Sequence, residues 1–201
     1  RIDMSQCAPE DKNNEILIEK YKANRLRVVR QVKYNPTREW SIDIVLFING
    51  IPTATLELKT DFTQSIEDAI TQYKEDRIPE YKMGAKKVPE PLLSFKRGAV
   101  VHFAMSDSEI AMTTELKGDS TFFLPFNKGN NGHAGNAPRE DGEYPVAYFW
   151  EEVCTRDSWL RIFHSFVYVE TKEKVDKHGK PYKAETLIFP RYHGNPPDKE
   201  R

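Results

Sequence analysis

The chain has few of the features that mark secreted or membrane proteins. Its two cysteines, Cys7 and Cys154, are too few for a disulfide framework and too far apart in sequence for a metal-binding knuckle. Even a largely apolar stretch such as residues 42–48, which includes Asp43, is far shorter than the roughly 20 residues that a membrane span needs. No signal-peptide pattern is visible. We therefore expect a cytoplasmic protein with no membrane partner.

An excess of positive charge is also lacking. Thirty Lys and Arg residues face 31 Asp and Glu residues, for a net charge of −1 and a pI near 6.6. This balance excludes a bulk polycation, so any contact with nucleic acid has to come from a local patch or from a larger assembly. No Walker-type phosphate loop occurs in the 201 residues. Because the chain begins with Arg1, we expect it to be a piece of a longer protein.

The order of hydrophobic patterns predicts an α/β fold with a mixed sheet. A first helix over residues 15–22 precedes a β-rich run over residues 26–34. Two strands, 42–48 and 53–59, are joined through Asn49-Gly50, which is the strongest short-range hairpin signal. Ser65 is a good N-cap for a second helix. Further elements are a buried strand (99–105), its hairpin partner (109–116), a short strand (121–126), a Gly-rich loop (127–142), a helical stretch (148–168) and an exposed hairpin (172–183).

The most informative stretch is the hairpin of residues 42–59. Asp43 opens its first strand, and Glu57 and Lys59 close the second strand on one face, with Leu58 turned toward the core. Neighbouring carboxylates are costly unless a positive group neutralises them. Mg²⁺, which takes one or two carboxylates and keeps several waters, is the fitting cation. We expect both acids to line a solvated cleft. Lys59 would orient a metal-bound water that attacks phosphorus.

A metal site at these residues requires a particular loop length between the two strands. A strict two-residue loop pairs Ile48 with Ile51, which sets Asp43 opposite Leu56 and leaves Glu57 on the other face. A metal site at the two acids therefore requires an odd-numbered loop or a β-bulge, with Gly50 or a neighbour in the left-handed region. A shift of one residue in the register would destroy the site.

An ordered series of segments resembles one known family, the amino-terminal nuclease domain of the restriction (motor) subunit of type I restriction-modification enzymes, the HsdR family. The matching segments are residues 24–31, 43–59, 65–73, 124–127, 156–160 and 189–193. The Glu-x-Lys motif alone is a weak signal. The whole series in this order is a specific one.

The resemblance implies a restriction-endonuclease-like PD-(D/E)xK fold, a mixed β-sheet flanked by helices with a C-terminal helical segment. Asp43 and Glu57 then match the two metal-binding acids and Lys59 the catalytic lysine, although Ile42 replaces the motif's proline. Tyr73 matches the tyrosine of a Gln-x-x-x-Tyr motif on the next helix, and Gln72 lies beside it, so both are candidate DNA or active-site contacts. Ala69 stands where that motif has glutamine, and Tyr73 is alternatively a core residue.

The resemblance also implies partners and boundaries. We expect Mg²⁺ as cofactor, with Mn²⁺ as a substitute, double-stranded DNA as substrate, and modification and specificity subunits as partners. ATP would bind only in a helicase-type motor outside this chain. The predicted organisation is an N-terminal helix region (1–24), a nuclease core (25–126), a Gly-rich loop with a helical annex (127–190), and the start of a link to the motor (191–201).

Two other functions stay open at this point. The chain could be a non-catalytic docking domain that couples a DNA motor to its partner subunits, or a stand-alone repair nuclease of the same superfold. A third acid for the metal could come from Glu15 or Glu19. His102, in mid-strand, is most simply a hydrogen-bonded structural histidine. The pairs Lys86-Lys87 and Lys96-Arg97 are candidate phosphate contacts.

Overall fold

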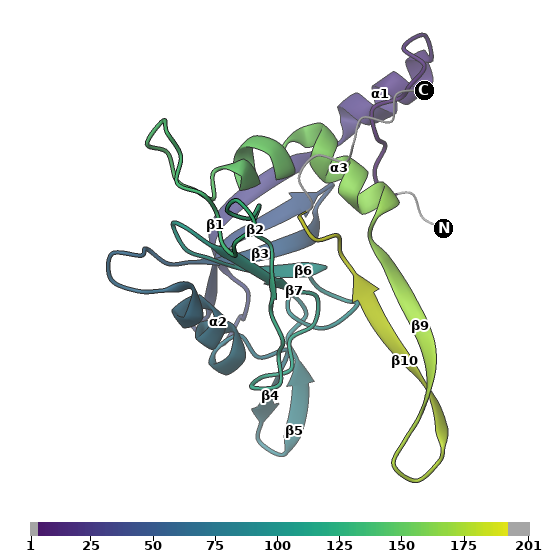
Figure 1. Cartoon of the computed structure of the whole chain (residues 1–201). Helices are drawn as coiled ribbons and strands as arrows, with labels where there is room; N and C mark the ends of the chain where they lie inside the picture. The colour runs from purple at the N-terminus through teal and green to yellow at the C-terminus, as the bar shows by residue number, and fades with distance from the viewer. Residues whose placement is uncertain (1–3, 193–201) are drawn as a thin grey trace.

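A six-stranded mixed sheet forms the centre of the computed structural model, which describes residues 4–192 (Figure 1). The strand order is β1-β2-β3-β6-β7-β8. Only β3 and β6 are parallel neighbours, and the other pairs are antiparallel. The bounds are β1 Leu26–Lys33, β2 Ser41–Ile48, β3 Ile51–Leu58, β6 Val101–Met105, β7 Ile110–Thr113 and β8 Leu124–Pro125. The predicted α/β class with a mixed sheet is confirmed.

Helices cover both faces of this sheet (Figure 1). Helix α2 (Ile66–Glu75) lies on one face and supplies the crossover that a parallel β3–β6 pair requires. Ser65 is its N-cap, as predicted, and forms a capping box with Asp68. The one-turn π-helix η1 (Phe149–Val153) and helix α3 (Arg156–Ser165) cover the other face. Helix α1 (Glu15–Ala23) lies beyond the end of the sheet where β1 begins.

The sheet separates two apolar clusters. On the η1 and α3 side, Leu46 and Leu56 pack with Trp159 and other buried residues. On the α2 side, Val45 and Ala104 pack with the helix residues Ile66, Ala69 and Tyr73. Strand β6 is buried along its whole length, which confirms the predicted central strand. These two layers hold the ends of β2 and β3 in place.

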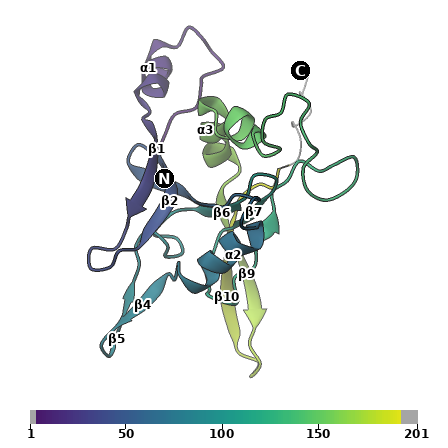
Figure 2. The same ribbon diagram turned by 90° about the vertical axis from the view of Figure 1, so that its left-hand side faces the viewer.

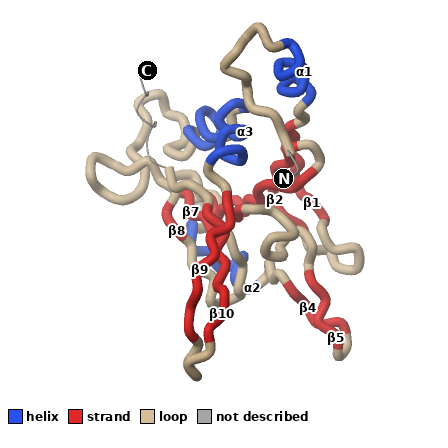
Figure 3. The backbone as a smooth tube through the Cα atoms, turned by 90° about the vertical axis from the view of Figure 1, so that its right-hand side faces the viewer, coloured by secondary structure: helices blue, strands red, loops and turns tan. Residues whose placement is uncertain are grey.

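Two hairpins project from the same side of the sheet (Figures 2 and 3). The hairpin of β9 (Tyr168–Val175) and β10 (Pro181–Ile188) confirms the predicted exposed hairpin. The hairpin of β4 (Glu80–Met83) and β5 (Lys86–Pro89) was not predicted. The Gly-rich stretch 127–142 contains no helix or named strand, as expected for a long loop.

Residues 193–201, which hold most of the predicted link to a motor, lie outside the described residues. Within residues 4–192, none of the helices combines the length and apolar character needed to cross a membrane.

Candidate active site

The β2–β3 hairpin contains the irregularity that the metal hypothesis requires. Asn49 and Gly50 both adopt positive φ values, 52° and 84°, and form a two-residue turn that pairs Ile48 with Ile51. The register then shifts between Leu46 and Phe47: Phe47 pairs with Pro52, but Leu46 pairs with Ala54. Thr53 is therefore one extra residue on β3, the arrangement of a β-bulge. Its hydroxyl donates a hydrogen bond of 2.9 Å to the Leu46 carbonyl.

The bulge brings the two acids together. Beyond it, Val45 pairs with Thr55 and Ile44 pairs with Leu56. The next position in this register sets Asp43 opposite Glu57, where Cβ atoms of facing residues are about 4.5–5.5 Å apart. Burial is the main cause of the raised pKa of Glu57, and the Asp43 carboxylate adds to it, as expected of a close negative charge.

Asp43 is half-buried and held at both of its carboxylate oxygens. Gln31 Nε2 donates to Oδ1 at 2.9 Å, and the backbone N–H of Leu58 donates to Oδ2 at 2.9 Å. Gln31 lies on β1 between the residue pairs Arg30–Ile44 and Val32–Ile42. Its φ of 48° is unusual for a residue with a side chain and occurs at the point where that side chain meets Asp43. Sequence reasoning did not assign this role to Gln31.

Glu57 is completely buried, which corrects the prediction that both acids line a solvated cleft. Arg77, just after α2, donates from Nε to Glu57 Oε1 at 2.5 Å. The other oxygen, Oε2, is buried without a hydrogen-bond partner. Burial raises the pKa of Glu57 to about 7, against the lowering effect of Arg77. The physical reason for the burial is that α2 and the segment after it cover this end of β3.

Lys59 follows the last residue of β3 and is half-buried. Its backbone N–H donates to the Met105 carbonyl at 2.9 Å, which extends the β3–β6 pairing past the end of the strand. Alternation along an extended chain places its side chain on the same face as Glu57. Leu58 is 39% exposed, so the prediction that it points into the core is wrong. On β3, Leu56 is the last residue that belongs to the buried cluster of this face.

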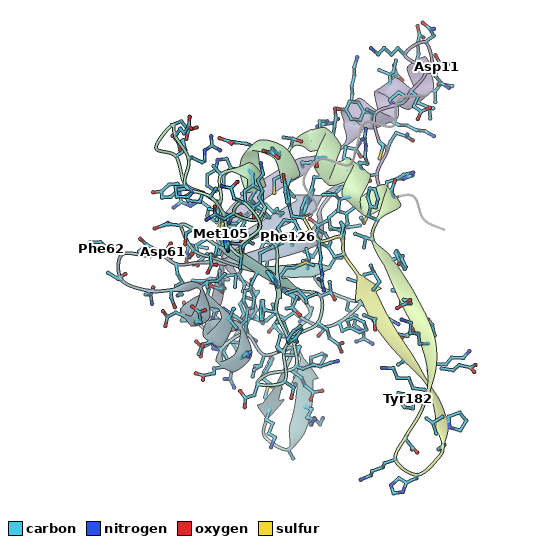
Figure 4. The ribbon with its side chains drawn as sticks, in the orientation of Figure 1. Asp11, Asp61, Phe62, Met105, Phe126 and Tyr182 are labelled. Carbon is cyan, nitrogen blue, oxygen red and sulfur yellow. The ribbon has the colours of Figure 1, made fainter. Side chains whose placement is uncertain are left out.

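The loop after Lys59 projects outward from this edge of the sheet. Figure 4 shows Asp61 and Phe62 at its tip, far out from Met105 and Phe126 in the interior. Phe62 is 92% exposed. Asp107 ties the base of the loop, since its carboxylate accepts from the Thr60 hydroxyl at 2.9 Å.

The donor set fits a hard divalent cation. The two acids face each other across β2 and β3, and Glu57 Oε2 is a buried carboxylate oxygen without a hydrogen-bond partner. Among residues 4–192, no group of three or more His, Cys, Asp or Glu side chains could hold a metal. A pair is sufficient for Mg²⁺, because this ion binds through one or two carboxylates and completes its shell with waters and substrate phosphates.

The helix residues Gln72 and Tyr73 occupy different environments. Tyr73 is fully buried, and its hydroxyl is 2.8 Å from Thr55 Oγ1, so it is a core residue and has no surface to offer DNA in this conformation. Gln72 is half-buried, and its Oε1 is buried without a partner. His102 is also buried, with Nδ1 2.7 Å from Thr55 Oγ1, and burial lowers its pKa to about 3. Its predicted structural role is confirmed.

The third acid suggested on the first helix is in the wrong place. Helix α1 leads into Leu26, which pairs with Ile48, whereas Asp43 lies at the other end of β2. Five residues of strand separate these ends by about 16 Å. Glu15 and Glu19 are, in addition, exposed. The candidate phosphate contacts Lys86 and Lys87 are exposed on β5 and remain a prediction.

Arg77 is the second residue of this site, after Gln31, that sequence reasoning missed. It lies 20 residues after Glu57, beyond the end of a helix. An arginine before Ile78-Pro79 reads as an ordinary charge at a helix end, and no local spacing signals its partner. Only the tertiary packing of α2 on the sheet brings it to Glu57.

Comparison with known families gives one match. A family model described as type I restriction enzyme R protein N terminus matches residues 10–121, more than half of the chain. The matched region runs from before α1 to beyond β7 and includes Gln31, Asp43, Glu57, Lys59 and Arg77. No curated protein sequence matches the chain.

Proposed function

The chain belongs to the family of type I restriction enzyme R protein N-termini, and on that premise we propose that it is the Mg²⁺-dependent DNA endonuclease domain of an R subunit. The observation that carries this proposal is the β-bulge at Thr53. It changes the register so that Asp43 faces Glu57, which an unbroken two-residue hairpin would prevent. Bulges recur beside active sites, where they re-aim a side chain.

Asp43 and Glu57 would hold the cation. When bound, Mg²⁺ supplies Lewis-acid polarisation of the phosphate and lowers the pKa of the attacking water. Gln31 and the Leu58 N–H fix the Asp43 carboxylate, and Arg77 fixes that of Glu57. Lys59, on the face of Glu57, orients the water and stabilises negative charge on the phosphate oxygens. Water attacks phosphorus, a P–O bond breaks, and no covalent enzyme intermediate forms.

The proposed substrate is double-stranded DNA, and the proposed partners are the modification and specificity subunits of the same complex. The chain's net charge of −1 supports this division of labour, because a nearly neutral domain has no general affinity for a polyanion. Sequence recognition and ATP-driven motion would then belong to other parts of the assembly.

The test is DNA cleavage by the assembled complex containing the full R subunit. Asp43→Ala should lower the cleavage rate by about 10³-fold or more, because loss of the cation removes several kcal/mol of transition-state stabilisation. Asp43 is the better choice than Glu57, since its half-buried side chain is not in a buried ion pair. Glu173→Ala, on the exposed strand β9, is the control acid. Cleavage that survives Asp43→Ala would contradict the proposal.

One observation favours the docking function instead. Glu57 is fully buried and ion-paired with Arg77, as a purely structural glutamate would be. A docking domain would tolerate Lys59→Ala in cleavage, whereas a nuclease would lose most of its rate. A stand-alone repair nuclease would differ from both, because the isolated chain would cleave DNA without partner subunits.

A further inference from the structure

Arg77 lies buried beside the candidate metal site, in contact with Glu57. Its side chain is almost entirely buried, and its Nε donates to Glu57 Oε1 at 2.5 Å. This is the sole side-chain hydrogen bond of Glu57 among residues 4–192. The arginine therefore determines where the carboxylate of this acid points.

This contact leaves the two carboxylate oxygens of Glu57 in different environments. Oε1 is bound to a cationic donor, and Oε2 is left without a protein partner although it is buried. Buried carboxylate oxygens are normally hydrogen-bonded, so an unpaired one requires an explanation. Asp43 lies opposite Glu57 across the hairpin. An oxygen held beside a second carboxylate has the environment of a cation ligand.

The other side of Arg77 is also occupied. Burial raises the pKa of the nearby Tyr34 hydroxyl to about 12; the Arg77 guanidinium opposes this rise, and Glu90 adds to it. Glu90 in turn accepts from Asn35 Nδ2 at 2.9 Å. These neighbours, together with the burial of Arg77, restrict the positions that its side chain can take.

We propose that Arg77 is the positioning residue of the metal site: it holds Oε1 of Glu57 so that Oε2 stays directed to the divalent cation shared with Asp43. The inference rests on the proposed function, because it assigns a role toward the same cation. Groups that orient metal ligands in this way typically change metal affinity by 10–100-fold when they are replaced. Arg77 touches neither substrate nor cation in this role.

The experiment is calorimetric titration of MnCl₂ into the 201-residue chain and four variants. Arg77→Ala should weaken Mn²⁺ binding by 10–100-fold. Arg77→Lys keeps the charge without the fork-shaped guanidinium and should give an intermediate affinity. Arg139→Ala removes an arginine from a surface ion pair with Asp141 and Glu151, and should leave the affinity unchanged. Asp43→Ala defines the signal that belongs to this site.

The results separate the two proposals. Equal Mn²⁺ affinity in the wild type and both Arg77 variants, with binding lost in Asp43→Ala, would overturn the positioning role and leave the proposed function standing. Both proposals would be overturned if Asp43→Ala bound Mn²⁺ as tightly as the wild type. They would also be overturned if the wild type bound no Mn²⁺ even with a DNA duplex present. Thermal unfolding of each variant shows whether it is folded. If Arg77→Ala does not fold, the comparison of Arg77→Lys with Arg139→Ala decides the question.

Discussion

Glu57 and Glu90 are both removed from solvent, and each keeps one buried carboxylate oxygen without a hydrogen-bond partner, yet their other oxygens meet different groups. Glu57 Oε1 accepts from the cationic Arg77, and Glu90 Oε2 accepts from the neutral amide of Asn35. Burial raises the pKa of both. The two carboxylates thus have the same solvation problem but different partners.

Their surroundings explain the difference. Glu57 faces Asp43, so the charges of the two acids have to be balanced in one place. Glu90 instead opens a turn in which its carbonyl accepts from Leu93 and Ser94, and its side chain ties this turn to the loop that follows β1. A buried acid with a neutral partner can serve the fold by taking up a proton. A buried acid with a charged partner and a second acid opposite it resembles a functional site.

The largest expected difference is between Arg77 and Asn35 in their contribution to the free energy of unfolding. Arg77→Ala should lower the free energy of unfolding by about 3–5 kcal/mol, because it leaves one member of a buried ion pair alone. Asn35→Ala should cost about 1–3 kcal/mol, because it leaves the buried Glu90 carboxylate without its hydrogen bond and also removes the acceptor of Thr37. Urea unfolding at pH 7.5 measures both values. Equal losses would mean that the charge of Arg77 adds nothing beyond its hydrogen bond.

The contribution of Glu57 to stability should also depend on pH. The pKa of Glu57 is about 7 in the folded chain, against an ordinary value of 4.5. The folded state therefore binds this proton more tightly, and the contribution of Glu57 to stability should rise as the pH falls from above 7 to below 4.5. The interval between the two pKa values corresponds to about 3 kcal/mol.

Glu57→Gln isolates this effect. Its urea unfolding should lack the part of the pH dependence that belongs to Glu57, while the contribution of Glu90 is common to both proteins and cancels in the difference. Parallel curves of stability against pH for the wild type and Glu57→Gln would show that Arg77 keeps the pKa of Glu57 near its ordinary value.

Sequence patterns predicted the hairpin and its need for an odd-numbered loop or a β-bulge, but not where the bulge lies. Asn49-Gly50 identified the turn, and the positions of Asp43 and Glu57 showed that a simple hairpin would set them on opposite faces. The bulge at Thr53 depends on contacts outside the hairpin: Trp159 Nε1 of α3 donates to Thr53 Oγ1 at 3.2 Å. A side chain more than 100 positions away is not visible in a local pattern.

The errors have equally specific causes. Leu58 was expected inside because its neighbours alternate, but it is the exposed last residue of β3, and Leu56 is the last residue of that strand in the buried cluster. The β4–β5 hairpin was missed because each of its strands has only four residues and half of the eight are charged, which is too short a pattern to identify a strand. Arg77 and Gln31 were missed because long-range packing, not spacing, brings each to its acid.

The smallest expected effect belongs to Glu90. Glu90→Gln keeps a carbonyl oxygen that can accept from Asn35 and removes a charge that burial disfavours. We expect its free energy of unfolding at pH 7.5 to stay within about 1 kcal/mol of the wild type. Mn²⁺ affinity of the chain and DNA cleavage by the assembled complex should be unchanged. A loss of Mn²⁺ affinity would contradict this separation of the two glutamates, because Glu90 and Arg77 both lie near the Tyr34 hydroxyl. The two buried glutamates would then belong to one electrostatic unit, with Arg77 between them.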